Sequence, residues 1–283
     1  MPRPAVRALL LALAVAVSAT MAPTLAQASE PVSHTLDGGS YVARPPAGWD
    51  GRRPLPLLVF FHGYRQQGSA VMTIPQLTAA ADRHGVLLVA PDGLEGSWAH
   101  QGSPSSRRDE SAFIDALLAD VGRRWPVDRS RRWAAGFSQG GSMAWHAACF
   151  RGRSFTAFMP VAGAFWRPHP EHCPGGPVNL LHTHGTADTV VPMAGRPIRT
   201  TFHQGDVREG MALWRDQDAC GGAPVRAASA GDLDCEAWTG CGSGRALELC
   251  LHPGGHKIPQ GWAGMAFEWA EAVSSRLVAD SPR

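Results

Sequence analysis

The chain has 283 residues, and its 26 Lys and Arg side chains nearly balance its 24 Asp and Glu side chains. This near-neutral charge argues against nucleic acid as a partner, because such binding depends on a strongly positive surface. The sequence shows no internal repeat, no long linker and no second long hydrophobic segment after its start. We therefore expect one α/β domain with a large core.

The first 28 residues have the pattern of a secretory signal peptide. Arg3 and Arg7 precede an apolar stretch over residues 8–17 that is too short to span a bilayer, and residues 26–28 read Ala-Gln-Ala, a typical cleavage site. We expect a cleaved segment 1–28 and a single catalytic domain 29–283. The mature protein should be secreted, either extracellular or periplasmic, with no membrane anchor.

Six cysteines follow the signal segment. An even number in an exported chain indicates three disulfides, for which the sequence alone allows fifteen pairings. No C-x-x-C pair occurs, and the histidines near residue 173 lack zinc-finger spacing, so no metal site is expected. The cysteines are Cys149, Cys173, Cys220, Cys235, Cys241 and Cys250.

The first half of the chain alternates between strand and helix patterns. A hairpin signal at residues 37–39 divides the strand material of residues 32–44, and apolar runs at residues 55–61 and 86–90 are typical of buried strands. Residues 69–84 predict a helix that Pro75 should bend or split. Residues 109–125 predict an amphipathic helix. The intervening residues 94–107 form a polar loop with one large aromatic side chain, Trp98.

The second half continues this alternation. Strands are expected at residues 132–136, 157–161, 178–182 and 247–251, and helices at residues 139–150, 206–216 and 262–277. Strands that alternate with helices predict a mostly parallel sheet with helices on both faces. Ligands bind beyond the carboxyl ends of such strands. Tyr64, Asp92 and Ser138 each follow a strand end, so we expect them on one face.

The central motif is Gly136-Phe137-Ser138-Gln139-Gly140, which ends a strand and opens a helix. This is the context that the G-x-S-x-G nucleophile elbow requires. The serine occupies a strained turn, where a side chain on Gly136 or Gly140 would crowd the neighbouring backbone. We predict that Ser138 is a nucleophile.

A serine hydroxyl needs a general base, and the chain offers an acid and a histidine in the order Ser, Asp, His. Asp188 lies in a tight turn after the strand at residues 178–182, and His256 follows two glycines after the last strand. We predict that His256 is the base and that Asp188 orients it. His252 is the alternative base. His182 and His184 are expected to pack near Asp188.

The oxyanion formed in such a reaction needs backbone N–H donors. We expect these from Gln139, the residue after the nucleophile, and from Tyr64, in the turn after the strand at residues 55–61. His62, which begins that turn, and Trp98 are candidate substrate-binding residues. For Trp98 the alternative is packing within its loop.

Together these motifs resemble the secreted esterases of the polyhydroxybutyrate depolymerase and feruloyl esterase group, within the α/β-hydrolases. The motifs that match are Phe61-His62-Gly63, Asp109 with Phe113 and Ile114, residues 136–141, residues 184–188 with Val191 and Pro192, and Gly254-Gly255-His256. In that group Trp-Pro often follows the last motif, whereas this chain has Lys257-Ile258-Pro259. The sequence of residues 136–141 also resembles the corresponding motif of carboxylesterases and acyl-protein thioesterases, which are usually intracellular.

The resemblance implies an α/β-hydrolase fold and hydrolysis of carboxylic esters, with no cofactor. The substrate would be an ester, either a small molecule or a polymer, and we expect a monomer. The group's usual cysteines match Cys149 with Cys173 and Cys220 with Cys241, which leaves Cys235 with Cys250. The alternatives are a secreted peptidase or lipase on the same scaffold, and a hydrolase-like surface protein without catalytic activity.

Overall fold

The computed structural model describes Met1, residues 29–227 and residues 229–279. The expected signal peptide and its cleavage site fall almost entirely outside these residues. Within the described residues, no helix has both the length and the apolar character needed to cross a membrane.

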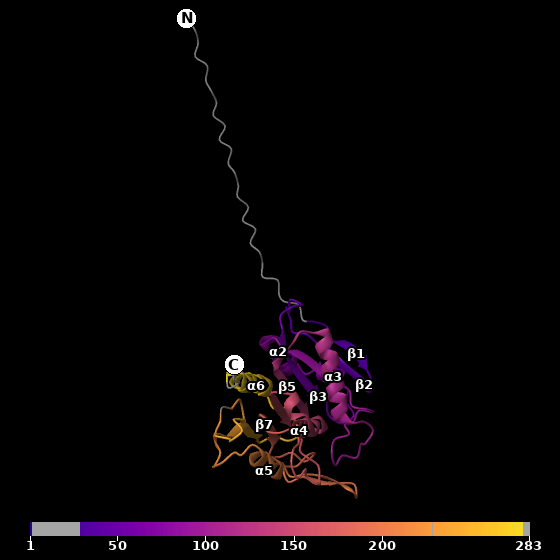
Figure 1. Ribbon diagram of the computed structural model, residues 1–283, viewed down its shortest axis with the longest axis vertical. Coiled ribbons are helices and arrows are strands. Elements are labelled where there is room, and N and C mark those ends of the chain that lie inside the picture. The colour runs from indigo at the N-terminus through magenta and orange to yellow at the C-terminus, as the bar shows by residue number, and fades with distance from the viewer. Residues whose placement is uncertain (2–28, 228, 280–283) are drawn as a thin grey trace.

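A ten-stranded sheet runs through the described part of the molecule (Figure 1). Its strand order is β1-β2-β4-β3-β5-β6-β7-β12-β11-β10. The six strands from β4 to β12 in this order are parallel, and antiparallel strands close both edges. The strands are β1 Val32–Leu36, β2 Gly39–Arg44, β3 Leu55–Phe61, β4 Leu87–Pro91, β5 Val127–Phe137, β6 Ala157–Val161, β7 Leu180–Gly185, β10 Val225–Arg226, β11 Asp234–Trp238 and β12 Leu247–His252.

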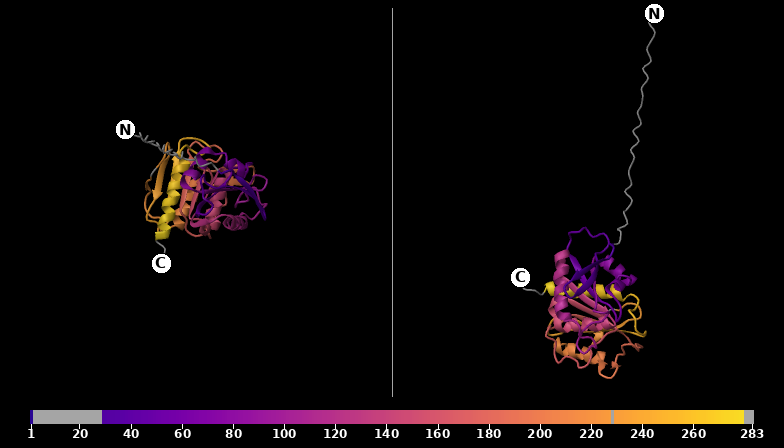
Figure 2. Two further views of the ribbon diagram at one scale, coloured as in Figure 1. Left: turned by 90° about the horizontal axis from the view of Figure 1, so that it is seen from above. Right: turned by 90° about the vertical axis from the view of Figure 1, so that its right-hand side faces the viewer.

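Helices cover both faces of this sheet, as the alternation of the sequence predicts (Figures 1 and 2). Successive residues of a strand point to opposite faces. Leu57, Val59 and Phe61 of β3 therefore pack with α3, α4 and α5, whereas Leu58 and Phe60 pack with α2 and α6. The helices are α1 Gly68–Val71, α2 Pro75–His84, α3 Glu110–Arg124, α4 Gln139–Arg151, α5 Val207–Gln217 and α6 Trp262–Ala279.

Local signals account for most of the helix boundaries. Pro75 divides the expected helix over residues 69–84 into α1 and α2, and it occupies the first turn of α2, where its missing N–H costs nothing. Asp109 caps α3 by accepting hydrogen bonds from the N–H groups of Ser111 and Ala112.

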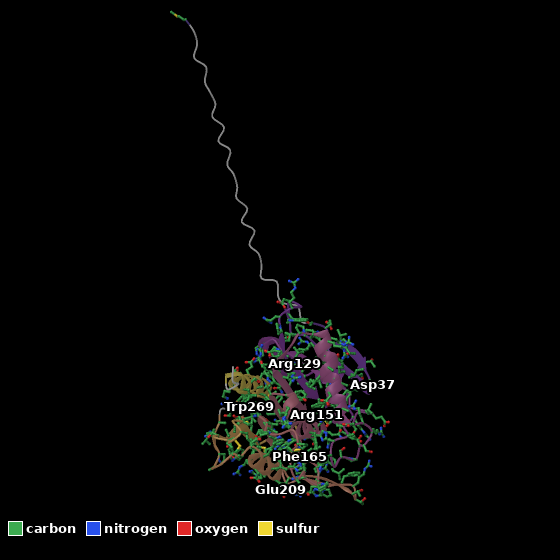
Figure 3. The ribbon with its side chains drawn as sticks, in the orientation of Figure 1. Asp37, Arg129, Arg151, Phe165, Glu209 and Trp269 are labelled. Atoms are coloured by element: carbon green, nitrogen blue, oxygen red, sulfur yellow. A yellow bond between two sulfur atoms is a disulfide. The ribbon has the colours of Figure 1, made fainter. Side chains whose placement is uncertain are left out.

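On α6, Trp269 reaches the sheet, where its Nε1 donates to Glu248 Oε1 of β12 at 2.8 Å (Figure 3).

Four short strands do not appear in the sequence-based prediction. β10 and β11 extend the sheet beyond β12, and β8 Arg196–Ile198 pairs with β9 Phe202–Gln204 in a separate hairpin. β11 lies within the cysteine-rich segment, where Cys235 pairs in register with Cys250 of β12.

Three disulfides join the six cysteines. They connect Cys149 with Cys173 and Cys220 with Cys241, the two pairs that the resemblance implied, and Cys235 with Cys250, the pair that remained. The first joins the end of α4 to the segment before β7, and the other two bind the segment between α5 and β12. The bridges therefore lie around the strands that lead to Asp188 and His256.

Candidate active site

Ser138 lies at the junction of β5 and α4, in a sharp turn. Its backbone has φ 59° and ψ −122°, a left-handed conformation that is rare for a residue with a side chain. The strain is held by neighbours on both sides, because Ser138 N–H donates to Val161 O and Ser142 N–H donates to Ser138 O, each at 3.0 Å. This is the backbone geometry of a nucleophile elbow.

The glycines of the motif are required by close backbone approach. A Cβ on Gly136 would lie 2.2 Å from Gly140 O, and a Cβ on Gly140 would lie 2.0 Å from Phe61 O. Both distances are far inside van der Waals contact, so any side chain at either position would push β5, α4 and β3 apart. The predicted crowding at Gly136 and Gly140 is confirmed.

The side chains of Ser138, His256 and Asp188 form one hydrogen-bonded chain. His256 Nε2 lies 2.8 Å from Ser138 Oγ, and His256 Nδ1 lies 2.7 Å from Asp188 Oδ2. The three residues come from the ends of β5, β7 and β12, which lie at the same edge of the parallel sheet. The structure thus brings together the three residues that the sequence singled out.

The turn after β7 holds the Asp188 carboxylate in place. Asp188 Oδ1 accepts hydrogen bonds from the N–H groups of Val190 and Val191, at 2.8 and 2.9 Å. Burial acts to raise the pKa of Asp188, but the hydrogen bonds from His256 and from these N–H groups outweigh it and hold the pKa below its usual value. Asp188 is therefore a carboxylate at neutral pH and leaves Oδ2 for His256.

Close contacts also fix the loop that carries His256. Ala187 N–H donates to Gly254 O at 3.2 Å, and a Cβ on Gly185 would lie 2.3 Å from that same oxygen. The ring of Phe137 packs on the ring of His256, with centroids 4.8 Å apart. Phe137 is a site residue that sequence reasoning did not single out, although it occupies a variable position of the elbow motif.

Among the described residues, the ring of His252, the alternative base, makes no hydrogen bond with Ser138 or Asp188. It is buried, and its Nδ1 accepts a hydrogen bond from Gly254 N–H at 3.1 Å within its own loop. His182 and His184 lie behind Asp188, as expected. His182 Nε2 lies 2.9 Å from His184 Nδ1, and His184 Nε2 donates to Val191 O at 2.7 Å. Burial lowers the pKa of both rings, so both are neutral.

Two backbone N–H groups near Ser138 are available to an oxyanion. Neither Gln139 N–H nor Tyr64 N–H donates a hydrogen bond to another described residue. The turn that carries Tyr64 adjoins the nucleophile, because a Cβ on Gly63 would lie 3.6 Å from Ser138 Cβ. Gln66, which the sequence did not identify, holds this turn by accepting a hydrogen bond from Gly63 N–H at 3.0 Å.

The predictions for Trp98 and His62 as substrate-binding residues are wrong. Trp98 is fully buried and packs edge-on against Phe61, while its Nε1 donates to His62 O at 2.9 Å. His62 is also buried. Its Nε2 accepts from Gly93 N–H at 2.9 Å and its Nδ1 donates to Gly63 O at 2.7 Å. The two side chains join the ends of β3 and β4 and have no surface for a substrate.

Within the described residues, no cluster of three or more His, Cys, Asp or Glu side chains is arranged to hold a metal ion. The observed arrangement is a hydrogen-bonded chain of Ser138, His256 and Asp188, with the N–H groups of Gln139 and Tyr64 making no hydrogen bond to another described residue.

Comparison with known proteins shows similarity to feruloyl esterases. A probable feruloyl esterase C of Aspergillus niger is 31% identical over 181 residues, which are 61% of this chain and 62% of that protein. Feruloyl esterase D of Neurospora crassa is 29% identical over 258 residues, 84% of this chain and 81% of that protein. The chain spans about three fifths of the length of the first relatives that it matches. No protein-family model matches it.

Solved structures show the fold. An acetyl xylan esterase from Aspergillus awamori superposes with a TM-score of 0.62 at 12% identity, over 87% of this chain and 99% of that one. The chain therefore has the α/β-hydrolase fold, and its sequence is similar to those of feruloyl esterases.

Proposed function

We propose that this chain is an exported serine esterase that hydrolyses carboxylic esters, and that feruloyl esters are its first candidate substrates. The observation that carries the proposal is the hydrogen-bonded chain from Ser138 Oγ through His256 to the Asp188 carboxylate. The sequence similarity to feruloyl esterases, over 61% of the chain in one relative and 84% in another, supports the substrate class.

The reaction begins with proton transfer from Ser138 Oγ to His256 Nε2, which are already 2.8 Å apart. The oxygen attacks the ester carbonyl, and the negative charge that develops on the carbonyl oxygen meets the N–H groups of Gln139 and Tyr64. Asp188 holds His256 with Nδ1 protonated and stabilises the imidazolium. Each oxyanion donor of this kind contributes about 10²–10³ to kcat.

The bond to the alcohol then breaks, and His256 gives its proton to the leaving oxygen. A water molecule repeats the cycle on the acyl-enzyme: His256 takes its proton, the hydroxide attacks the acyl carbonyl, and Ser138 leaves with the proton returned. The products are an alcohol and a carboxylic acid. No cofactor takes part in this scheme.

Two observations support the export part of the proposal. Residues 1–28 have the pattern of a signal peptide, and three disulfides are typical of proteins that fold in an oxidising compartment. We therefore place the mature chain, residues 29–283, outside the cytoplasm as one catalytic domain.

The test is hydrolysis of p-nitrophenyl acetate, butyrate and octanoate and of methyl ferulate by the purified protein and by Ser138→Ala. We expect turnover of the short-chain esters and of methyl ferulate, and a loss of several orders of magnitude in kcat for Ser138→Ala. Ser275→Ala, which removes a hydroxyl on the exposed side of α6, is the matched control and should keep full activity.

Equal rates for the wild-type protein and Ser138→Ala would refute the nucleophile. A preference for octanoate over all other esters would favour a lipase, and cleavage of a peptide p-nitroanilide with none of the esters would favour a peptidase.

A further inference from the structure

Two histidines of β7, His182 and His184, lie in the core behind the turn that carries Asp188. Both side chains are fully buried, and so is the indole of Trp145, which packs edge-on against His182 with ring centroids 5.1 Å apart. Residues two apart on a strand point to the same face, so the two imidazoles are neighbours. Burial of a polar ring is costly unless its nitrogens find hydrogen-bond partners. The proposed reaction uses neither ring.

Hydrogen bonds join these side chains from one element to the next. Trp145 Nε1 lies 3.2 Å from His182 Nδ1, and His182 Nε2 lies 2.9 Å from His184 Nδ1. His184 Nε2 lies 2.7 Å from Val191 O. We call these four residues the buried histidine chain. It begins on α4, the helix that follows Ser138, and ends in the turn after β7.

The direction of the hydrogen bonds in this chain is fixed from both ends. An indole N–H only donates, so His182 Nδ1 accepts, and the proton of this ring is on Nε2. A carbonyl oxygen only accepts, so the proton of His184 is on Nε2, and its Nδ1 accepts from His182. The two assignments agree at the central hydrogen bond. A second proton on either ring would set one N–H group against another.

The surroundings keep both rings neutral, as this pattern requires. Burial lowers the pKa of both. On His184, the hydrogen bond to Val191 O and the charge of the Asp188 carboxylate act to raise the pKa without overcoming burial. His256 and His252, in the segment at the end of β12, act in the same direction as burial.

The buried histidine chain ends on a residue that anchors the Asp188 carboxylate. Val191 accepts from His184 through its carbonyl oxygen, and its N–H donates to Asp188 Oδ1 at 2.9 Å. His184 Nε2 also lies 3.6 Å from Asp188 Oδ2, the oxygen that is bonded to His256. This distance is too long for a hydrogen bond. A neutral His184 therefore leaves Oδ2 to His256, whereas a cationic ring would compete for the same carboxylate.

We propose that His184 is a positioning residue, which holds the Asp188 carboxylate at hydrogen-bond distance from His256. It acts through Val191, whose carbonyl oxygen it binds. His182 and the indole before it fix the tautomer and the orientation of the His184 ring. The inference rests on the proposed function, in which Asp188 orients His256. A change at residue 184 should alter that orientation without touching the substrate.

The test is a matched pair of amide substitutions at residue 184. His184→Gln puts an amide nitrogen near the position of Nε2, so it keeps a donor for Val191 O and loses the acceptor for His182. His184→Asn ends near the position of Nδ1, so it keeps that acceptor and loses the donor. Each variant loses one hydrogen bond, and a purely structural role would affect both equally.

We expect the two variants to differ in kcat for methyl ferulate, counted per Ser138 that reacts with a fluorophosphonate. In His184→Asn, kcat should fall about 10²-fold with KM unchanged, because a displaced Asp188 no longer orients His256. His184→Gln should keep kcat close to that of the wild-type protein.

A spectroscopic measurement separates this inference from the proposed function. The Nδ1 proton of His256, which is hydrogen-bonded to Asp188, gives a low-field proton resonance whether or not an ester is hydrolysed. We expect this resonance in the wild-type protein and in His184→Gln, and its loss or upfield shift in His184→Asn. In the wild-type protein, ¹⁵N spectra should show residues 182 and 184 as neutral rings with the proton on Nε2.

The outcomes are distinct. If no ester is hydrolysed but the resonance changes as expected, the proposed function fails and the positioning role stands. If esters are hydrolysed and both variants lose kcat equally, or if the low-field resonance is the same in both, the positioning role is overturned. A wild-type ring at residue 182 or 184 with its proton on Nδ1 overturns it even where neither variant folds.

Discussion

At the scale of single residues, the geometry of the candidate site depends on two glycines that have no Cβ atom. Gly136 and Gly140 leave no room for a Cβ between the backbones of β3, β5 and α4. That close packing holds Ser138 at φ 59°, a conformation that costs about 1–3 kcal/mol and persists only where the surroundings impose it. The position of the hydroxyl therefore depends on the packing of backbones as well as on its hydrogen bond to His256.

Gly140→Ala tests this reading of the elbow. The added Cβ would lie 2.0 Å from Phe61 O, so we expect a loss of about 1–3 kcal/mol or more in the free energy of unfolding, together with loss of esterase activity. Gly122→Ala is the matched control. A Cβ there, on the exposed side of α3, has no atom within 4 Å, and the change should stabilise the helix by about 0.5–1 kcal/mol.

Thermal unfolding of both variants gives the comparison. If Gly140→Ala and Gly122→Ala have the same melting temperature, the packing argument for the elbow is wrong.

Individual site residues were predictable where a motif fixes the backbone. The elbow, the turn at Asp188 and the two glycines before His256 each identified one residue of the hydrogen-bonded chain. Trp98 and His62 were misjudged because the loop over residues 94–107 has no periodicity, so nothing in the sequence shows that the loop folds back and buries them. Gln66 has no sequence signal, since its partner is a backbone N–H group.

At the scale of elements, a buried carboxyl group joins the end of α5 to the segment before β7. Asp218 ends α5 and is fully buried, and its Oδ1 accepts a hydrogen bond from Val178 N–H at 3.2 Å. Its backbone oxygen accepts from Ser243 N–H in the loop before β12. Burial raises the pKa of Asp218 to about 7, although Val178 N–H and the charge of Arg245 act in the opposite direction.

This raised pKa predicts a pH-dependent stability. The folded chain keeps the Asp218 proton up to about pH 7, whereas the unfolded chain releases it near the ordinary aspartate pKa of 3.8. The folded state thus binds more protons in that interval, and the free energy of unfolding should fall as pH rises through it and level off above it. Asp218→Asn keeps the acceptor for Val178 N–H and cannot ionise. In this variant the part of the decrease in unfolding free energy that comes from residue 218 should disappear.

Melting temperatures at pH 5 and pH 8 measure the effect. We expect the decrease between these values to be smaller in Asp218→Asn than in the wild-type protein, and unchanged in Asp216→Asn, an exposed neighbour. A decrease in Asp218→Asn as large as that of the wild-type protein would show that Asp218 does not titrate in this range.

At this scale, the strands with the strongest hydrophobic pattern were the ones whose bounds the sequence predicted. β3 and β6 have the expected bounds because each is a short apolar run that is buried throughout. β11 was missed because its five residues lie among cysteines, glycines and polar side chains. Its place is fixed by pairing with β12 and by the Cys235–Cys250 disulfide rather than by its own composition.

At the scale of the whole molecule, the parallel sheet brings the residues of the candidate site together. Residues 138, 188 and 256 are distant in the chain, yet each follows the carboxyl end of a parallel strand, and those ends share one edge. The same rule puts the cavity that Ser40, Gln66 and Asp92 line at this edge, after β4. Fold and site location were therefore predictable together, whereas the cavity was not, because three separate loops form it.

The central claim is that Ser138, His256 and Asp188 form a working proton relay. The most direct measurement is labelling with a fluorophosphonate probe, followed by mass mapping of the modified peptides in the wild-type protein and in His256→Ala. We expect a single adduct, on Ser138, and a labelling rate that falls by orders of magnitude in His256→Ala. An adduct on another residue, or equal labelling rates in the two proteins, would contradict the relay.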